Sequence, residues 1–465
     1  MVSLRILRIE LKRSVAPWSG VTVLVTALAL LYLAGVARGT GTTAWTAQWT
    51  SLALWTRSLL AYLWPLAMGF GALQGLRDHR SKMSELLTST PRPARHRAAT
   101  LTGATALTLA SAFALLVLVG GVQVLTNTEY AHLGWLPISL VGALSLVAAA
   151  VLGMGAGRAL PSTLTPPALA MGAFVFTSLM YMSLGRTTTY TASGIPTTEP
   201  NQLSLLSPAV EQVRDVLLTL SAPVHVGQTV WLLGMATTGF ALLIAATRRA
   251  RLIALTPVLA GAVIALLVLP SDPRRMYVVD EAAAELVCDG PVCVTRTQQA
   301  RLPDFADHGK EALRLLHGAL GGRAPVSIRE NAAVPPVGST PHWSREKVLV
   351  DFDDDVIAAA QGKDLTRALI ATAMVPGCSP LGLATVSAND TAARIIAAGW
   401  VLGDPKPLGA ISLATRHFMA LADPVWKELK ALPRAEQLSR INAMHAAAIS
   451  CKGDPFEVLS GGASR

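Results

Sequence analysis

The sequence predicts a polytopic α-helical membrane domain followed by a soluble α+β domain, and three observations support this division. Of the 465 residues, 52% are hydrophobic and 15% are charged, and the mean hydropathy of +0.46 is too high for a soluble globular protein. The first 270 residues hold 18 Lys and Arg against 7 Asp and Glu, whereas the remainder hold 21 against 22. All four cysteines lie in the remainder. We therefore expect the soluble domain to occupy residues 271–465.

The first segment, residues 1–16, is basic and amphipathic. At 100° per residue, Leu4, Leu7 and Leu11 share one face, and the basic side chains lie beside it. We expect an interfacial helix on the cytoplasmic surface. The apolar run 15–37 that follows is longer than the core of a signal peptide and precedes further spans, so we interpret it as a transmembrane helix instead.

Seven stretches of the first part approach or exceed the roughly 20 residues needed to cross the hydrocarbon core. They cover residues 15–37, 52–75, 101–125, 135–156, 166–185, 229–247 and 252–269. The first six form a helical domain over 17–251, and 252–269 is a seventh transmembrane helix. Arg57 lies near the outer end of the second stretch, where we expect its side chain to snorkel to the headgroups. Residues 207–220 are expected to form a short helix on the outer surface.

The charge distribution predicts the orientation of these spans. With a cytoplasmic N-terminus, 14 of the 18 cations fall in cytoplasmic segments, leaving Arg38, Arg57, Arg186 and Arg214 outside. This agrees with the positive-inside rule, and it favours orientation in a lipid bilayer over binding of nucleic acid. Seven crossings then place 271–465 outside the cytoplasm. We expect a multi-pass protein of the cell membrane with an extracytoplasmic C-terminal domain.

The cysteines give independent support for an oxidising compartment, because an even number confined to one soluble domain is typical of disulfides. Cys288 and Cys293 flank an Asp-Gly-Pro-Val turn, which favours a local disulfide and leaves Cys378 to pair with Cys451. Buried free thiols are the alternative. A zinc site is disfavoured, because neither pair has the two-residue spacing of a zinc ribbon.

The soluble domain reads as a mixture of strands and helices. Strands are expected on both sides of the turn between Cys288 and Cys293, and again at 324–330 and 347–352. Helices are expected at 305–320, 363–375, 389–401 and 423–451. An acidic run, Asp351 and Asp353 to Asp355, is interpreted as a strand end leading into a helix N-terminus. Clustered carboxylates also suit Ca²⁺, but the glycine and glutamate spacing of an EF-hand is missing.

The long basic loop 77–100 separates the second and third spans. Within it, residues 78–88 predict a short amphipathic helix that prolines terminate. Its apolar side is formed by Met83, Leu86 and Leu87, its polar side includes Arg80 and Glu85, and Pro91 ends it. A surface helix between two membrane helices suits a coupling element, because a soluble partner that pushes on it moves both spans.

The order of residues in this loop, Glu85, Leu86, Leu87, then Ser89, Thr90 and Pro91, resembles the cytoplasmic loop after the second membrane helix of ABC-2 type transporter permeases. The resemblance covers roughly residues 1–251, and it implies partner coupling through Arg80, Met83, Glu85, Leu86, Leu87 and Pro91. It also implies an ABC ATPase subunit that uses ATP and Mg²⁺, and a second permease subunit, identical or different. The chain has no Walker A motif, so we expect no ATPase activity and no cofactor in the chain itself. The seventh helix and the domain 271–465 depart from this family.

A second resemblance concerns the soluble domain. The segments DLTRALIATAMVPG at 364–377 and TAARIIAAGWVLGDP at 391–405 resemble the two helices that carry the zinc ligands of gluzincin-type peptidase domains. Ala, Ile and Thr stand where the His and Glu ligands would be, which implies a degenerate domain without metal and without catalytic residues. An unrelated α/β domain is the alternative. Neither an H-E-x-x-H nor a G-x-S-x-G motif is present.

Together, these expectations predict a transmembrane permease subunit that moves a hydrophobic or amphipathic substrate, with an outer domain for cargo binding or gating. Met171, Met180 and Met182 of the fifth span either line a lipid-like substrate path or pack against neighbouring helices. Two alternatives stay open: a membrane-anchored sensor whose outer domain binds a ligand, and a tethered peptidase-like protein.

Overall fold

The computed structural model describes residues 16–37, 43–46, 48–80, 93–128, 130–190, 196–210, 217–333, 341–352, 354–378, 387–409 and 413–462. The chain divides into two compact units. The helical unit comprises residues 1–189 and 198–280, and the α/β unit comprises residues 190–197 and 281–465. Residues 271–280 therefore belong with the helices, and the boundary lies ten residues later than the sequence predicts.

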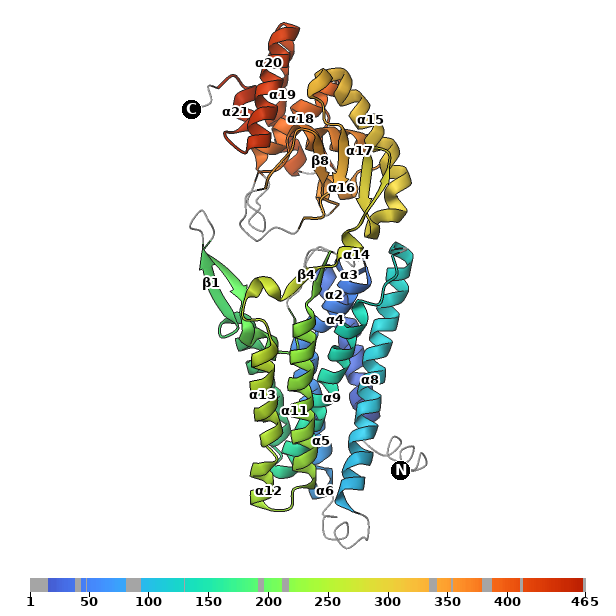
Figure 1. Ribbon diagram of the computed structural model, residues 1–465, viewed down its shortest axis with the longest axis vertical. Coiled ribbons are helices and arrows are strands. Elements are labelled where there is room, and N and C mark those ends of the chain that lie inside the picture. The colour runs from blue at the N-terminus through green and yellow to red at the C-terminus, as the bar shows by residue number, and fades with distance from the viewer. Residues whose placement is uncertain are drawn as a thin grey trace. The chain divides into compact units, whose positions relative to one another are not determined.

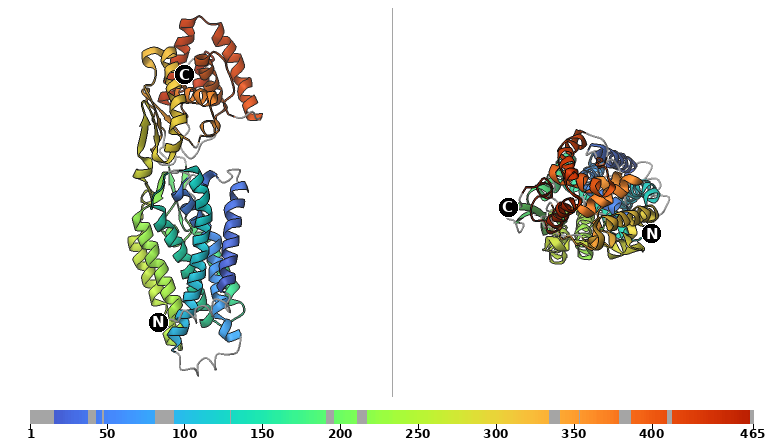
Figure 2. Two further views of the ribbon diagram at one scale, coloured as in Figure 1. Left: turned by 90° about the vertical axis from the view of Figure 1, so that its right-hand side faces the viewer. Right: turned by 90° about the horizontal axis from the view of Figure 1, so that it is seen from above.

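The helical unit is a bundle of long helices, several of which run side by side (Figure 1; the left view of Figure 2). Its helices are α2 (Ala16–Ala37), α3 (Thr43–Thr46), α4 (Trp49–Ser58), α5 (Leu60–Gly75), α6 (Arg77–Arg80), α8 (Ala94–Asn127), α9 (Trp135–Ala159), α10 (Thr165–Met182), α11 (Ala222–Ile244), α12 (Arg248–Ile253) and α13 (Thr256–Val268). Helix α9 lies at the centre, because it packs against α5, α8 and α11. Helix α13 packs against α11, and α2 packs against α8.

Five helices of the described residues are long and apolar enough to cross a membrane. They lie at Ala16–Leu33, Ala94–Asn127, Trp135–Ala159, Ala222–Ile244 and Arg248–Val268. The chain therefore has the character of a membrane protein. The predicted second span corresponds to α4 and α5, which Leu59 separates, and the predicted fifth span corresponds to the 18-residue α10. The count of seven crossings and their direction stay predictions.

Glycines bring the backbones of α5, α9 and α11 into close contact. A Cβ atom built on Gly71 of α5 would overlap the backbone carbonyl of Ala150 in α9. A Cβ atom on Gly239 of α11 would likewise overlap the backbone of Val151. Small residues at such crossings allow membrane helices to approach closely. This close packing stabilises the bundle, because apolar burial alone does not hold helices together in lipid.

Short strands occupy the connection between α10 and α11. Strands β1 (Arg186–Tyr190) and β2 (Pro196–Pro200) form one two-stranded sheet, and the 3₁₀ helix η1 (Gln202–Leu206) follows. Strand β3 (Leu218–Leu220) pairs antiparallel with β4 (Tyr277–Val279). The surface helix predicted at 207–220 is therefore wrong at both ends, because residues 207–210 are irregular and 218–220 are a strand. The strand's partner, β4, lies beyond the three helices α11, α12 and α13, so local periodicity does not reveal it.

The α/β unit is built on a four-stranded sheet in the order β5-β6-β7-β8. Its strands are β5 (Leu286–Asp289), β6 (Val292–Thr295), β7 (Ser327–Glu330) and β8 (Lys347–Val350). Strands β5 and β6 pair antiparallel, whereas β6, β7 and β8 pair parallel. The tight turn between β5 and β6 requires Gly290, whose φ is 62°. The strands predicted on either side of this turn are confirmed.

Helices complete this unit. They are α14 (Glu281–Ala284), α15 (Leu302–Leu320), α16 (Asp355–Ala359), α17 (Lys363–Met374), α18 (Ala388–Leu402), α19 (Leu413–Ala431), α20 (Arg434–Ser450) and α21 (Pro455–Leu459). Two of them pack directly on the sheet: α15 on β5, β6 and β7, and α17 on β8. The inner faces of the helices and the strands share one hydrophobic core. The single helix predicted at 423–451 is wrong, because Leu432 and Pro433 divide it into α19 and α20. A proline cannot donate the backbone hydrogen bond that a continuous helix needs there.

Both disulfides predicted from the sequence are present in the α/β unit. Cys288 and Cys293 face each other across β5 and β6, with an S–S distance of 2.11 Å. Cys378, after α17, is joined to Cys451, at the end of α20, with an S–S distance of 2.07 Å. Because such bonds persist in oxidising compartments, the α/β unit has the character of an extracytoplasmic domain.

We expect the two disulfides to contribute unequally to stability. The Cys378–Cys451 bond closes a loop with a sequence separation of 73, whereas the Cys288–Cys293 bond spans only 5. By the loop-entropy relation, removing the former by Cys378→Ser with Cys451→Ser costs about 4 kcal/mol, and removing the latter costs about 2 kcal/mol. Hydrogen exchange of α17 and α20 in the full chain measures this. Equal effects of the two double variants would contradict the argument.

Candidate functional site

The predicted coupling residues lie in or next to the part of the chain that the structure leaves out. Arg80 is the last residue of α6. Met83, Glu85, Leu86, Leu87 and Pro91 lie outside the described residues, as does the amphipathic segment 1–15. The chain resumes at Pro93, which directly precedes α8. The coupling function of this loop therefore stays a prediction.

The helical unit contains a cavity of about 580 Å³, which lies within the usual size range of ligand pockets. Its walls come from α2, the junction of α4 and α5, α10, η1 and the start of β4. Met180 and Met182 line it, as one interpretation of the fifth span suggested, whereas Met171 is exposed elsewhere on α10. The rings of Tyr62 and Phe174, 6.3 Å apart, form an apolar part of the wall.

A proline in α5 leaves one backbone carbonyl without a hydrogen-bond donor beside this apolar wall. Pro65 lies inside α5 and has no N–H, so the carbonyl of Ala61, four residues earlier, loses its intrahelical donor. The hydroxyl of Thr177 in α10 donates to the Phe174 carbonyl of its own helix over 2.9 Å and also lies 3.4 Å from the Ala61 carbonyl. Both Ala61 and Thr177 line the cavity. The sequence signal was available, because a proline within an apolar span frees a carbonyl at a known position.

Arg186 supplies the charge of the cavity. Its guanidinium carbon lies 5.0 Å from the centre of the Tyr181 ring, and its Nε donates to the Tyr181 carbonyl over 2.8 Å. Asn201 donates to the Arg186 carbonyl over 3.3 Å, which fixes the backbone at this point. Among the described residues that line the cavity, Arg186 is the one charged side chain, and none is acidic.

A second arginine, Arg57, holds a segment next to the cavity wall in place by hydrogen bonds. The side chain of Arg57 in α4 is 0% exposed, so the prediction that it snorkels to the headgroups is wrong. Its Nε and Nη2 donate to the Pro208 carbonyl over 3.0 and 2.8 Å, and its Nη1 donates to the Ile138 carbonyl over 3.3 Å. Nη2 also donates to Gln228 Oε1 over 2.8 Å. These partners satisfy the guanidinium inside the bundle, so it need not reach water.

Gln228 of α11 extends this network to the cavity itself. Its Nε2 donates to the carbonyls of Leu205 and Ser207 over 3.0 and 3.3 Å, and both of these residues line the cavity. Arg57 and Gln228 thus hold the segment that follows η1 against α4, α9 and α11. Sequence reasoning missed this role, although an arginine within an apolar span is itself a signal of function.

In the α/β unit, the two segments that resemble zinc-binding helices form α17 and α18, and they pack against each other. A different polar contact joins them: the buried Arg367 donates to the Asp404 side chain over 2.7 Å and to its carbonyl over 2.9 Å. Hydrogen bonds from Arg367 and then Lys406 hold the pKa of Asp404 below its usual value. Among the described residues, no group of three His, Cys, Asp or Glu side chains is placed to hold a metal ion.

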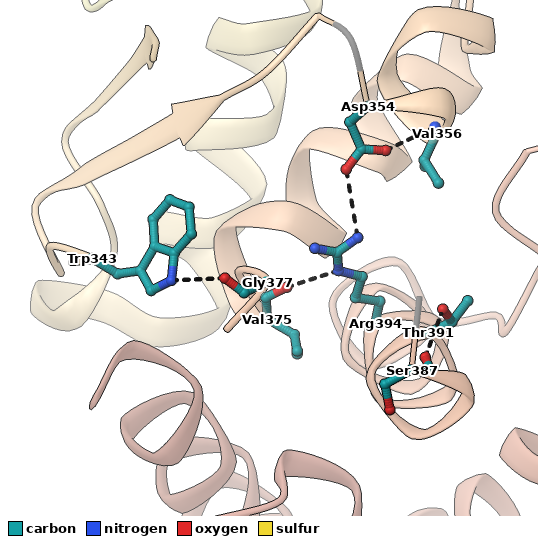
Figure 3. A network of polar contacts seen from close by, with 8 residues as sticks. All are labelled: Trp343, Asp354, Val356, Val375, Gly377, Ser387, Thr391 and Arg394. Atoms are coloured by element: carbon teal, nitrogen blue, oxygen red, sulfur yellow. Dashed lines mark hydrogen bonds and ion pairs between the residues drawn. The ribbon is translucent and has the colours of Figure 1, made fainter. Parts of the chain in front are cut away.

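A further polar network ties the end of α17 to its surroundings (Figure 3). Arg394 of α18 donates to the Val375 carbonyl over 2.9 Å and lies 3.7 Å from the carboxylate of Asp354. Trp343 donates to the Gly377 carbonyl over 3.1 Å. Asp354 also accepts from the Val356 backbone over 2.8 Å as the N-cap of α16, which confirms the helix-start interpretation at this one position of the acidic run. The network is consistent with a structural role.

The α/β unit is expected to lose stability in mild acid through His445 of α20. Its Nδ1 contacts the Met374 carbonyl at 3.0 Å, and its buried Nε2 has no hydrogen-bond partner among the described residues. Burial lowers the pKa of His445, the Met374 contact offsets part of this, and Arg345 lowers it further. The unfolded chain therefore binds this proton more readily than the folded one. The stability that neutral His445 contributes is present above its unfolded pKa of roughly 6.5 and is lost as the pH falls through the folded pKa.

Hydrogen exchange of α20, corrected for intrinsic rates, measures this effect between about pH 7 and about pH 5. His445→Gln cannot titrate in this range, so its protection is expected to change less with pH. An equal pH dependence in the wild-type chain and in His445→Gln would assign the effect to other groups.

Comparison with known proteins does not place the chain in a family, because no protein-family model, no curated protein and no solved structure matches it.

Proposed function

We propose that this protein is the permease subunit of an ABC-2-like transporter, which moves an amphipathic substrate with energy from ATP hydrolysed by a separate subunit. The observation that carries the proposal is the cavity of about 580 Å³, which opens among membrane helices and has both apolar walls and a cation. A protein whose helices served only as an anchor has no need of such a cavity. The extracytoplasmic α/β unit would bind or gate the cargo.

Two further features support the proposal. The loop after α6 carries the Glu-Leu-Leu and Ser-Thr-Pro pattern of ABC-2 permeases, in the position where such a permease contacts its ATPase. Helix α5 links the loop to the cavity, because Tyr62 of α5 lines the cavity and Gly71 of α5 is in close backbone contact with α9. A displacement of the loop would therefore be transmitted to the cavity through the closely packed helices α5, α9 and α11. A second permease subunit completes the assembly in that family's plan.

Co-purification from the native host tests the proposal. The full chain is cross-linked, solubilised in detergent and analysed by mass spectrometry, and a Leu86→Glu with Leu87→Glu variant is treated in parallel. The matched control is Leu133→Glu with Leu413→Glu, which changes two exposed leucines outside the loop. We expect a subunit with a Walker A motif to accompany the native and control chains and to be lost from the loop variant.

The opposite result is equally informative. If no ATP-binding subunit accompanies the native chain, the permease proposal fails, and a membrane-anchored sensor becomes the better interpretation. If such a subunit binds all three chains equally, coupling through Leu86 and Leu87 is wrong.

A further inference from the structure

The backbone carbonyl that Pro65 leaves without its helical donor belongs to a residue that lines the cavity, Ala61. We propose that the cavity binds a neutral amphiphile with a hydroxyl head group, which donates its hydrogen to the Ala61 carbonyl, while the alkyl tail lies along α5 and α10. This inference rests on the proposed function, because it names the substrate class of the same cavity.

The first argument concerns the hydrogen available to this carbonyl. A helical carbonyl accepts from the N–H four residues later, which proline lacks. The hydroxyl of Thr177 carries a single hydrogen, and its oxygen lies 2.9 Å from the Phe174 carbonyl but 3.4 Å from the Ala61 carbonyl. The shorter contact takes most of this hydrogen. The Ala61 carbonyl therefore keeps acceptor capacity in an apolar wall, where an unmet hydrogen bond is unfavourable.

The second argument concerns the oxygen of the ligand. Ser178, the next residue of α10, also lines the cavity, and its hydroxyl has no hydrogen-bond partner among the described residues. A ligand hydroxyl is both a donor and an acceptor, so it can donate to Ala61 and accept from Ser178. An ionised carboxylate has acceptors only and cannot satisfy the Ala61 carbonyl.

The third argument concerns the charge of the ligand. The described residues that line the cavity include no acidic side chain, so an ammonium head group would have no counter-charge there. The guanidinium of Arg186 lies against the Tyr181 ring, and its Nε donates to the Tyr181 carbonyl. A neutral head group leaves these contacts in place.

The fourth argument concerns entry and selectivity. Tyr62 is 52% exposed and Met182 is 77% exposed, so the rim of the cavity reaches the surface of the bundle that we expect to face lipid. An amphiphile can therefore enter sideways from the bilayer. Its tail gains little by this transfer, because lipid tails are as apolar as the cavity wall. Selectivity must then come from the head group, and so from its hydrogen bond to Ala61.

Photolabelling of the purified full chain tests the inference without any ATPase. The chain is placed in phosphatidylcholine nanodiscs with hexadecanol that carries a diazirine on its alkyl chain, and labelled peptides are mapped by mass spectrometry. Diacylglycerol with the same photoreactive chain distinguishes a bilayer lipid from a single-chain amphiphile as the source. Each hydroxyl probe is compared with its methyl ether, which accepts a hydrogen bond but cannot donate one.

We expect a hydroxyl probe to label peptides of α5 and α10 about fivefold more than its methyl ether, as for one neutral hydrogen bond. Pro65→Ala supplies the N–H that the Ala61 carbonyl lacks, so this difference should disappear. Thr177→Val removes the competing hydroxyl and should preserve or increase the difference. The matched control is Pro257→Ala, because this proline lies outside the cavity in the first turn of α13, where an N–H has no acceptor within the helix.

Three results would overturn the inference: equal labelling by the hydroxyl probes and their methyl ethers, an undiminished difference in a folded Pro65→Ala, or a loss of the difference in Thr177→Val or Pro257→Ala. If Pro65→Ala does not fold, the comparison of probes on the wild-type chain and on Thr177→Val still decides. Failure here combined with a co-purifying ATPase would refute only the substrate class. Selective labelling without any ATPase would retain the binding site and refute the transporter.

Discussion

A Gly71→Ala variant is expected to lose about 3 kcal/mol of unfolding free energy, at the upper end of the usual cost of overpacking. The added methyl group would overlap the Ala150 carbonyl, and this obstacle is backbone, not the flexible end of a side chain. Helices α5 and α9 must therefore move apart along their whole contact. Gly239→Ala is expected to have a similar effect on the contact of α9 and α11, where the obstacle is the backbone of Val151.

The matched controls are Gly172→Ala in α10 and Gly103→Ala in α8, since a Cβ atom at either position meets nothing within 4 Å. In these two variants the better helix propensity of alanine should leave stability unchanged or raise it by about 0.5 kcal/mol. Denaturant titration in detergent micelles, followed by tryptophan fluorescence, measures all four. Equal midpoints for Gly71→Ala and Gly172→Ala would show that α5 and α9 are not in backbone contact.

An Arg57→Ala variant is expected to lose about 4 kcal/mol, because truncation leaves both a large void and several buried carbonyls without a donor. The Pro208 carbonyl loses two donors, and the Ile138 carbonyl and the Gln228 amide oxygen lose one each. The segment after η1 then loses its attachment to α4 and α9. The same titration measures the loss, and limited proteolysis of the α10–α11 connection reports its release.

Arg57→Lys should recover part of this loss, because an ammonium reaches fewer of these acceptors but keeps the charge. Arg248→Ala, at an exposed position of α12, is the control for removing an arginine as such. If Arg57→Ala is as stable as Arg248→Ala, the buried network contributes nothing net, and desolvation of the guanidinium offsets its hydrogen bonds.

Much of the fold could be predicted from local sequence. Long uncharged runs identified the five membrane-type helices, and the Asp-Gly-Pro-Val turn located β5, β6 and one disulfide. The error at residues 207–220 has a non-local cause. Strand β3 depends on a partner 57 residues away, as the pairing of Leu220 with Tyr277 shows, and no local pattern carries that information.

Less of the site could be predicted. The methionines of α10 suggested a path, and two of the three line the cavity, but its other walls come from segments scattered between α2 and β4. Arg57 was misplaced because the sequence shows only that an arginine lies near the end of an apolar run. Whether its side chain points to headgroups or into the bundle depends on Pro208 and Gln228, which lie more than 150 residues later.

The pairing of β3 with β4 also constrains how the chain is threaded through a bilayer. Hydrogen-bonded strands must lie on the same side of the membrane, since an open ladder cannot span the hydrocarbon core. The chain between Leu220 and Tyr277 must therefore cross an even number of times. Helix α11 and the α12–α13 pair are the two helices of this stretch that are long and apolar enough to cross a membrane, so two crossings are the expected arrangement. If one of these two helices failed to insert, β3 and β4 would lie on opposite sides of the membrane and could not pair. Formation of this small sheet therefore depends on the insertion of both helices.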